Sequence, residues 1–438
     1  MSEKRDYNPD DIILSLDIGT EFVKVLIAEH QKDDSLKIIG AAKVHQEIGN
    51  MYAGAIADIP AVISTCEKAL SIAEEEAGVV SRAAVVGIAG ELIKGSTSTV
   101  RYRRKNSAKP ITEAEMDMII SRVQESAGEK ARKAVAVETG NPDVEVRLIN
   151  SAIVSLTIDG YKVSNPISFK GSELVIQFYT AFAPLVHISA IEKVCAELNL
   201  DLLAVAVEPF AVCRACLGDE TDSDLSAIVM DIGGGTTDVA VVDDGGVDGT
   251  KMFGIGGRSF THQIASKLGM DFDTAESIKL NLDRELLTDP TAIAIADRIS
   301  GDDYVNYLET PSRRAKIEEA VQANIDVWLS GVQIALEDFT VLEMLPHKIL
   351  LCGGGAGLIK LQEALATEDW WEDLPFSRRP EVHILDDLDI PGITNATNID
   401  LDYTYITAFG LLRVALDTMS GVEAEEGLRA KLAKLLQN

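Results

Sequence analysis

The sequence predicts an α/β protein of two related halves, with a smaller α+β unit inserted into the first half. Its 438 residues are too many for a single hydrophobic core. Two distant segments, 14–27 and 228–242, share one design: an apolar run is broken by an aspartate and a glycine-containing turn, and then resumes. Between them, residues 86–183 have a different pattern, in which segments with the alternation typical of strands flank one long helical segment. The repeated design predicts two halves that face one ligand.

Composition narrows the class of protein. A hydrophobic content of 46% with 25% charged residues is typical of soluble globular proteins. The net charge of −30 argues against general nucleic-acid binding, which needs a basic surface. The polar N-terminus is unlike a signal peptide, and no apolar run reaches the roughly 18 residues of a membrane span. We therefore expect a cytoplasmic protein.

The five cysteines lack disulfide-like spacing, which favours a reducing compartment. Cys213 and Cys216 form a C-x-x-C inside an alanine-rich, helix-like run, without a second pair that would complete a metal site. We interpret them as buried small residues.

The first half begins with the elements of an α/β layer domain. A hairpin is expected at 12–28 and a further strand at 37–46. Helical spacing over 57–78 ends at a glycine, and 83–90 is a buried type of strand. This order of a β-meander followed by a helix predicts a sheet covered by helices.

The inserted unit has its own elements. Thr112 and Glu115 have the spacing of a capping box at the start of a helix over 111–135, and strands follow around 145–158 and 173–182. The basic cluster Arg101, Arg103, Arg104 and Lys105 precedes this helix. It is either a solvated loop or a contact for an acidic surface on a neighbouring subunit.

The remaining chain continues the α/β pattern. Its expected elements are a helix at 185–200, a strand entering a helix in "LLAVAVEPF", a hairpin around Asp231, a helical region from 258 to about 343, a strand, glycine turn and helix over 347–365, and a final helix at 403–416.

The two repeated segments contain groups that can bind phosphate. A glycine in a tight turn lets the backbone approach a ligand, and backbone N–H groups with the hydroxyls of Thr20, or of Thr236 and Thr237, can then face phosphate oxygens. Asp17 and Asp231 can hold Mg²⁺ through water. A single D-x-G-T is equally compatible with an ordinary hairpin turn, but two copies predict a clamp around a triphosphate.

A third glycine turn completes the pattern. In "LLCGGGAGL" a strand ends in Gly353, Gly354 and Gly355, whose flat backbone can carry an adenine ring and an α-phosphate. It matches neither the P-loop nor the Rossmann fingerprint.

In this order, the motifs resemble those of the actin and heat-shock-chaperone ATPase superfamily. "LSLDIGTEFVKVLI" and "VMDIGGGTTDVAVV" resemble its phosphate motifs, "VAVEPFAV" and "YTYITAFGLLRVAL" its connecting segments, and "LLCGGGAGLIKL" its adenosine motif. The place of the insertion, its stretch "SAIVSLTIDGYKVSNPISFKGSELVIQFYTAFAP", and "GIGGRSFTHQIASKLGMDFDTAESIK" look most like the bacterial cell-division protein FtsA. The resemblance implies an actin-like two-domain ATPase fold with an inserted small α+β domain.

The resemblance also implies a site and its cofactors, ATP and Mg²⁺. Expected nucleotide contacts are Gly19, Thr20, Lys24, Gly233, Gly234, Gly235, Thr236, Thr237, Glu276, Lys279, Gly353, Gly354 and Gly355, with Asp17 and Asp231 as metal ligands. Glu208 and Asp231 are the expected catalytic residues; Glu208 would position water or act as a base. Glu208 could equally be a helix N-terminal acid, and Glu276 with Lys279 an ordinary surface pair.

Glu21 departs from the implied pattern, which usually has a small hydroxyl or similar residue there. At 4 Å and an effective dielectric constant near 20, a carboxylate would repel each unit of phosphate charge by roughly 4 kcal/mol. Glu21 is therefore expected to point outward, or to weaken nucleotide binding.

The resemblance divides the chain as follows: subdomain 1A at 12–85, 184–217 and 403–417; the inserted subdomain 1C at 86–183; subdomain 2A at 218–258 and 345–402; subdomain 2B at 259–344; and a linker with an amphipathic tail at 418–438.

The implied function is an ATP-binding, at most weakly hydrolysing, actin homologue that polymerises at the inner face of the membrane and tethers FtsZ during cell division. Its partners would be the FtsZ C-terminal peptide, other copies of itself and an anionic membrane surface. The tail would bind that surface because Leu428, Leu432, Leu435 and Leu436 share one helical face. A terminal helix packed on its own body is the alternative for this tail.

A PilM-like scaffold of type IV pilus assembly and a small-molecule kinase of the same superfamily are the alternative functions.

Overall fold

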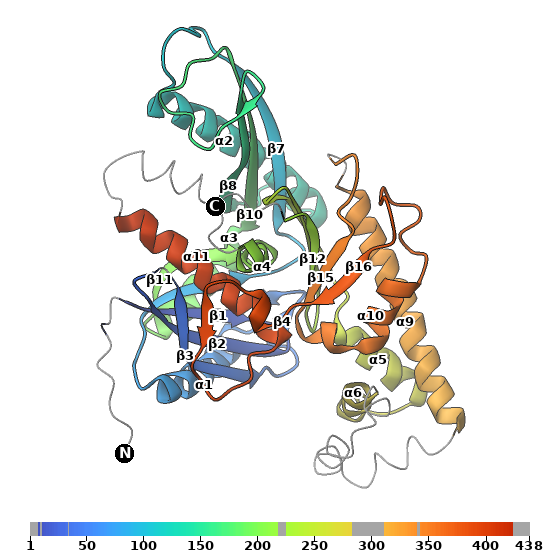
Figure 1. The fold of residues 1–438 in the computed structure, drawn as a ribbon. Helices are drawn as coiled ribbons and strands as arrows, with labels where there is room; N and C mark the ends of the chain where they lie inside the picture. Colours follow the sequence, from blue (N-terminus) through green and yellow to red (C-terminus); the bar gives the residue numbers. More distant parts are fainter. Residues whose placement is uncertain are drawn as a thin grey trace.

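The computed structural model describes residues 8, 11–33, 35–217, 225–282, 311–339 and 342–423 (Figure 1). The predicted tail at Leu428–Leu436 lies outside this range. Among the described residues, no helix combines the length and the apolar character that crossing a membrane requires.

The first half contains a six-stranded sheet. Its strands, in sheet order, are β11 (Asp201–Val207), β6 (Ala83–Ile88), β1 (Ile12–Ile18), β2 (Phe22–His30), β3 (Leu36–His45) and β17 (Ile393–Asn395). Helix α1 (Ile59–Ala77) packs on β2 and β3 and contacts α3 (Leu185–Glu197). The helix α1 begins where the Asp58 side chain accepts the N–H of Ala61 and ends at Gly78, which has φ +69°.

The second half repeats this topology. Its strands are, in sheet order, β16 (Glu381–Ile384), β15 (Lys348–Cys352), β12 (Ala227–Ile232), β13 (Thr237–Asp243) and β14 (Gly246–Phe253). In both halves an antiparallel three-stranded meander is followed by two parallel strands on its first strand. The echo between 14–27 and 228–242 therefore corresponds to the same hairpin in each half.

Two helices lie between the sheets. Helix α11 (Ile406–Glu423) packs on the first sheet, and α4 (Glu208–Leu217) packs on β12 and β13 and against α11. A Cβ on Gly410 would lie 2.0 Å from the carbonyl oxygen of Ala211, so glycine allows the two helices to cross closely. Helix α11 continues through residues 418–423, which were expected to be a linker.

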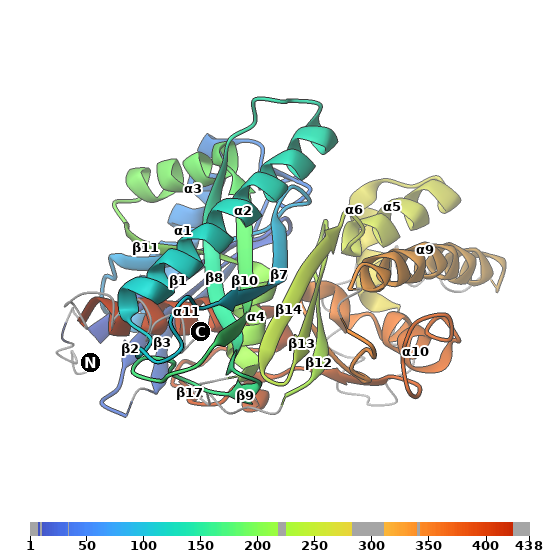
Figure 2. The ribbon, with the colours of Figure 1, turned by 90° about the horizontal axis from the view of Figure 1, so that it is seen from above.

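On its outer face the second sheet carries further helices among the described residues: α5 (Gly257–Leu268), α6 (Phe272–Asn281), α9 (Pro311–Glu337) and α10 (Ile359–Thr367). Strand β12 alternates accordingly, because Ile228 and Met230 join the core beneath these helices while Val229 joins the core shared with α4 and α11. In Figure 2, α5 and α9 lie on the side of β12 to β14 that faces away from the first half.

The inserted unit consists of β7 (Lys94–Arg103), α2 (Glu113–Thr139), β8 (Val146–Ile158), β9 (Tyr161–Lys162) and β10 (Glu173–Pro184), and has a hydrophobic core of its own. Its strands also extend the second sheet, because β7 pairs with β14 through Ser96 and Gly95. A Cβ on Gly95 would lie 2.0 Å from the hydroxyl oxygen of Thr250, so this junction depends on glycine.

The basic cluster of the insert separates into different roles. Thr112 caps α2 as predicted, but the carboxylate of Glu115 lies 2.8 Å from Arg104. The guanidinium of Arg104 also donates to the carbonyl oxygens of Lys109 and Gly171, each at 3.0 Å. Arg104 is therefore a structural residue, and the interpretation of the whole cluster as a solvated loop or partner contact is wrong for this member.

Short elements complete the described part of the chain: β4 (Met51–Tyr52), β5 (Ala55–Ile56) and the 3-10 helices η3 (Gly354–Gly357), η4 (Asp387–Asp389) and η5 (Tyr403–Tyr405). All five cysteines are free thiols; Cys213 is buried, as interpreted from the sequence, and Cys216 is half-buried.

Candidate functional site

A cavity of about 250 Å³ lies between the two halves. It is lined by most of the residues that the sequence analysis selected: Asp17, Gly19, Thr20, Lys24, Glu208, Asp231, Gly233, Gly234, Thr236, Glu276, Lys279, Gly353, Gly354 and Gly355. Gly235 and Thr237 are not part of the lining. Residues from both hairpins, the start of α4 and the turn after β15 thus meet at one cavity.

The two hairpin turns face each other across this cavity. A Cβ on Gly234 would lie 2.9 Å from the Cβ of Glu21, and a Cβ on Gly235 would lie 3.1 Å from the hydroxyl oxygen of Thr20. The absence of side chains in the second turn therefore permits its close approach to the first turn. Gly235 serves this contact between the turns.

Thr237 has a different role from the one predicted. Its hydroxyl donates to the carbonyl oxygen of Ile255 at 2.7 Å and accepts the indole N–H of Trp328 at 2.9 Å. Thr237 and Trp328 are completely buried in the second half. The expectation that the Thr237 hydroxyl faces phosphate is wrong, because both its hydrogen-bonding functions are engaged in the core.

Several carboxyl groups converge on the floor of the cavity. Asp17, Glu208, Asp231 and Asp238 are buried and line the cavity together with Lys24. The ammonium of Lys24 lies 2.7 Å from Asp17. Burial disfavours its charge, but the neighbouring carboxylates, chiefly those of Asp17 and Asp231, outweigh this and raise the pKa of Lys24.

The same crowding of buried acids also raises the pKa values of the acids themselves. Burial, followed by the charges of Asp17, Asp238 and Asp231, raises the pKa of Glu208 well above its ordinary value. Burial and then the charge of Asp231 do the same to the pKa of Asp238. Burial also raises the pKa of Asp231, although Lys24 and a hydrogen bond from Thr407 oppose the rise. The cavity thus gathers more buried carboxyl groups than Lys24 alone can pair with, and carboxyl groups with such shifted pKa values are typical of functional sites.

The third glycine turn lies against Asp231. Gly353 has φ +80°, and a Cβ there would lie 2.1 Å from a carboxylate oxygen of Asp231. A Cβ on Gly355 would meet the side chain of Ile232 at 2.4 Å, whereas a Cβ on Gly354 meets no atom within 4 Å. The first and third glycines are therefore needed for packing, and Gly354 leaves open space in the cavity lining.

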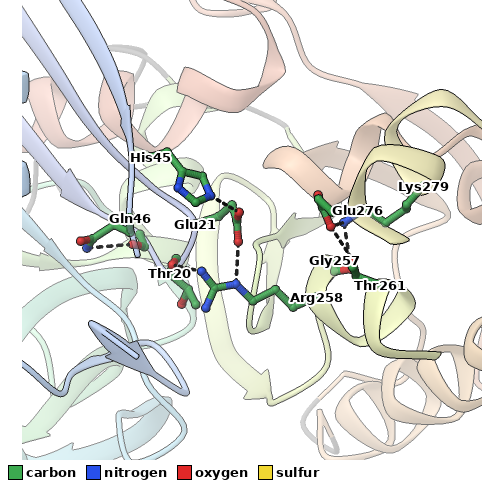
Figure 3. A network of polar contacts seen from close by, with 10 residues as sticks. Thr20, Glu21, His45, Gln46, Gly257, Arg258, Thr261, Glu276 and Lys279 are labelled. Carbon is green, nitrogen blue, oxygen red and sulfur yellow. Dashed lines mark hydrogen bonds and ion pairs between the residues drawn. The ribbon is translucent and has the colours of Figure 1, made fainter. Parts of the chain in front are cut away.

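Glu276 and Lys279 form an i, i+3 pair on α6, with their charged groups 2.8 Å apart (Figure 3). The hydroxyl of Thr261 donates to Glu276, and Lys279 donates to the carbonyl oxygen of Gly257 at 3.1 Å. The pair is largely buried and lines the cavity. It therefore joins α6 to α5 at the cavity, and the interpretation as an ordinary surface pair is wrong.

Glu21 also lines the cavity and is held by two partners (Figure 3). Its carboxylate oxygens lie 2.6 Å from Nε of Arg258 and 2.7 Å from Nε2 of His45. The expectation that this carboxylate points away from the site is wrong, because a cation from the second half holds it there.

The donor set fits a magnesium ion that keeps part of its hydration shell. Within the described residues, no three His, Cys, Asp or Glu side chains are grouped closely enough to chelate a metal directly. The surplus of buried carboxyl groups nevertheless favours a cation, and Oδ1 of Asp238 is buried without a hydrogen-bond partner in the described part of the chain. Mg²⁺ commonly retains several waters and takes only one or two carboxylates from the protein.

Sequence reasoning missed Asp238, Lys43 and Arg258 in the lining. Asp238 could have been predicted from the sequence. It is the last residue of the motif "DIGGGTTD", and strand alternation places its side chain on the same face as that of Thr236. Arg258 follows the glycine turn "GIGG", but its contact with Glu21 depends on how the two halves meet.

The repeated sheet topology, the two central helices and the cavity between facing glycine turns define the class as the actin-like α/β fold with an inserted α+β domain. A PilM–PilN type IV pilus biogenesis complex contains a chain of this fold, with a TM-score of 0.61 at 16% identity, covering 92% of this chain and 98% of that chain.

Sequence comparison gives the particular relationship. The family model "Cell division protein FtsA" matches residues 228–399. FtsA of Pseudomonas aeruginosa is 25% identical over 423 residues, covering 93% of this chain and 90% of the relative. FtsA of Bacillus subtilis is 25% identical over 364 residues, covering 80% and 75%. The chain is thus related to FtsA over most of its length, and the resemblance inferred from the motifs is confirmed.

Proposed function

We propose that the chain binds ATP together with Mg²⁺ in the cavity between its two halves. The observation that carries this proposal is the meeting of two glycine hairpin turns above a buried surplus of carboxyl groups. The N–H groups of the turns and the hydroxyls of Thr20 and Thr236 would bind phosphate oxygens. The backbone at Gly354, with Glu276 and Lys279, would bind the nucleoside.

Asp17 and Asp231 are the proposed magnesium residues, acting through water, and we add Asp238 because of its unpaired buried oxygen. A bound cation would neutralise both these carboxylates and the phosphates. Lys24 would hold Asp17 in place through their ion pair. Cation binding and nucleotide binding are therefore expected to support one another.

Glu208, the first residue of α4, is the proposed residue for positioning attacking water, with Asp231 beside it. A carboxyl group accepts a proton only when it is ionised, and burial with neighbouring acids raises the pKa of Glu208. This reduces its ionised fraction at neutral pH. As the resemblance to FtsA implies, the proposal is for at most a weak ATPase.

The relationship to FtsA supports a role for this chain in cell division as an actin-like filament protein. We propose that it polymerises at the inner face of the membrane and tethers FtsZ through the FtsZ C-terminal peptide, a contact for which the helical region 259–344 is the expected surface. The tail at Leu428–Leu436 would bind anionic lipid as an amphipathic helix. The subdomain boundaries stay a prediction.

A scaffold of type IV pilus assembly is the second candidate, and its specific support is the likeness of fold to the PilM–PilN complex. At 16% identity, this likeness concerns the fold alone. The sequence relationship favours FtsA. Copurification with FtsZ, as opposed to a pilus inner-membrane protein, separates the two. ATP turnover stimulated by a sugar would instead support the small-molecule kinase.

The adaptor function is tested by pelleting the full chain on anionic vesicles with Mg–ATP and an FtsZ C-terminal peptide, followed by electron microscopy. We expect the peptide to pellet with the chain and filaments to lie on the vesicles. A variant that ends at residue 423 serves as the control: it should stay in the supernatant with the vesicles, but should still bind the peptide when the two are titrated in solution. Failure of the full chain to pellet at low salt would contradict the membrane role, and a peptide left in the supernatant would contradict the tethering role.

A further inference from the structure

An ion pair joins the two halves beside the cavity. Nε of Arg258 lies 2.6 Å from the carboxylate of Glu21, and Nη2 of Arg258 donates to the carbonyl oxygen of Thr20 at 2.9 Å (Figure 3). Glu21 belongs to the turn between β1 and β2, and Arg258 to the first turn of α5. Residues that are far apart in sequence are thus in direct contact at the hairpin turns.

Arg258 is anchored to the second hairpin turn by its own backbone. Its N–H donates to the carbonyl oxygen of Gly234 at 2.8 Å, and the N–H of Gly257 donates to Gly233 at 2.9 Å. The backbone of Arg258 is therefore held at the second turn, while its guanidinium contacts the first turn. These are the turns to which the proposed function assigns the phosphate groups.

The ion pair between Glu21 and Arg258 is largely shielded from solvent, so we expect it to contribute measurably to the contact between the halves. The side chains of Glu21 and Arg258 are 20% and 13% exposed, so solvent and salt screen their attraction less than on an open surface. Removing either partner leaves a partly buried charge without its main compensation. His45, at 2.7 Å, fixes the other oxygen of the Glu21 carboxylate and limits its freedom to turn away.

A phosphate group bound at the turns would compete with this contact. Guanidinium groups bind carboxylates and phosphates in the same planar geometry. Glu21, Thr20, Gly234 and Arg258 line the same cavity, so a terminal phosphate there would be repelled by the carboxylate and attracted by the guanidinium.

We propose that Glu21 and Arg258 form a clasp between the halves that a nucleoside triphosphate has to open, so that Glu21 competes with the terminal phosphate for Arg258. Glu21 then determines how strongly the site distinguishes a triphosphate from a diphosphate. The part of this proposal that concerns nucleotide rests on the proposed function, whereas the clasp itself does not.

The competition predicts opposite effects of the two neutralising substitutions. Glu21→Gln frees Arg258, so the affinity for a triphosphate relative to a diphosphate should rise about tenfold. Arg258→Gln leaves the Glu21 carboxylate uncompensated, and the same ratio should fall. The double variant should lie between the single variants. Glu115→Gln is the matched control, because Glu115 is 19% exposed and pairs with Arg104 inside the insert.

The nucleotide arm uses isothermal titration of the full chain with ADP and with a non-hydrolysable ATP analogue, both with Mg²⁺. A ratio in Glu21→Gln within twofold of the unaltered protein, as in Glu115→Gln, overturns the competition. If the unaltered chain binds neither nucleotide, the proposed function and the competition both fail. The clasp is then decided by the second arm alone.

The second arm measures the clasp without nucleotide. Spin labels at the exposed positions Lys68 of α1 and Ala323 of α9 report the distance between the halves. We expect a narrow distance distribution that broadens in Arg258→Gln and narrows again when Glu21→Arg is combined with Arg258→Glu. Identical distributions in the unaltered chain and in Arg258→Gln overturn the clasp.

Discussion

The ammonium of Lys24 lies 2.7 Å from the carboxylate of Asp17, and the two side chains are only 13% and 3% exposed. This is the lysine at the centre of the acidic floor of the cavity, where Glu208 and Asp231 also contribute to its raised pKa. The charge of the buried Lys24 thus interacts favourably with several buried acids. The pair therefore contributes both to the stability of the chain and to the charge of the site.

Replacing Lys24 by methionine should destabilise the protein at neutral pH by about 3 kcal/mol, because breaking a buried ion pair leaves the remaining charge uncompensated. The loss should become smaller at an acidic pH, because burial raises the pKa of Glu208 and of Asp238 and these two neighbouring acids then take up protons. Urea unfolding at both pH values measures this. An equal loss at both would show that Lys24 contributes through packing alone.

Asp238 should make stability pH-dependent. Its folded-state pKa is raised, so its contribution to stability is present below the ordinary aspartate pKa and is lost as the pH rises through the folded-state value. Asp238→Asn removes this titration. As the pH rises above the ordinary aspartate pKa, without magnesium, the variant should therefore gain stability relative to the unaltered chain, at up to about 1.4 kcal/mol per pH unit until the pH passes the folded-state pKa of Asp238. Parallel stability curves from calorimetry would contradict this assignment.

The glycines after β15 should separate binding from folding. Gly354→Val places a side chain in open space at the cavity lining and should weaken nucleotide binding at least about tenfold, with little change in melting temperature. Gly355→Val forces a side chain against Ile232 and should lower the melting temperature markedly. Thermal melts and nucleotide titration of both variants distinguish the two roles. Unchanged nucleotide binding in Gly354→Val would place the nucleoside elsewhere.

The insert provides a contrast between neighbouring arginines. Arg104→Ala removes a side chain that is 3% exposed and should destabilise the chain by about 3 kcal/mol, because Glu115 loses its partner. Arg101 is exposed, and Arg101→Ala should change stability by no more than about 0.5 kcal/mol. Denaturant titration of the two variants tests this. Similar small effects would mean that the Arg104 contacts are not maintained in solution.

The strand and turn patterns were sufficient to predict much of the fold and of the cavity lining. The apolar hairpins around Asp17 and Asp231 have a period and a turn that depend on local sequence, and therefore could be identified directly. The same holds for the cap of α2 at Thr112, which depends on residues a few positions apart.

What could not be predicted depends on contacts between distant segments. The direction of the Thr237 hydroxyl is determined by Trp328, and the position of the Glu21 carboxylate by Arg258. Local sequence contains no information on either pairing. The joining of the insert to the second sheet is equally non-local, because it requires Gly95 to lie beside Thr250.

The most direct test of the central claim, that the acidic cavity between the halves binds a magnesium-complexed adenine nucleotide, is isothermal titration of the full chain with a non-hydrolysable ATP analogue. We predict binding of one nucleotide per chain, weakened when magnesium is chelated and when Asp231 is replaced by asparagine. The absence of binding to ATP, ADP or the analogue in the presence of magnesium would contradict the account.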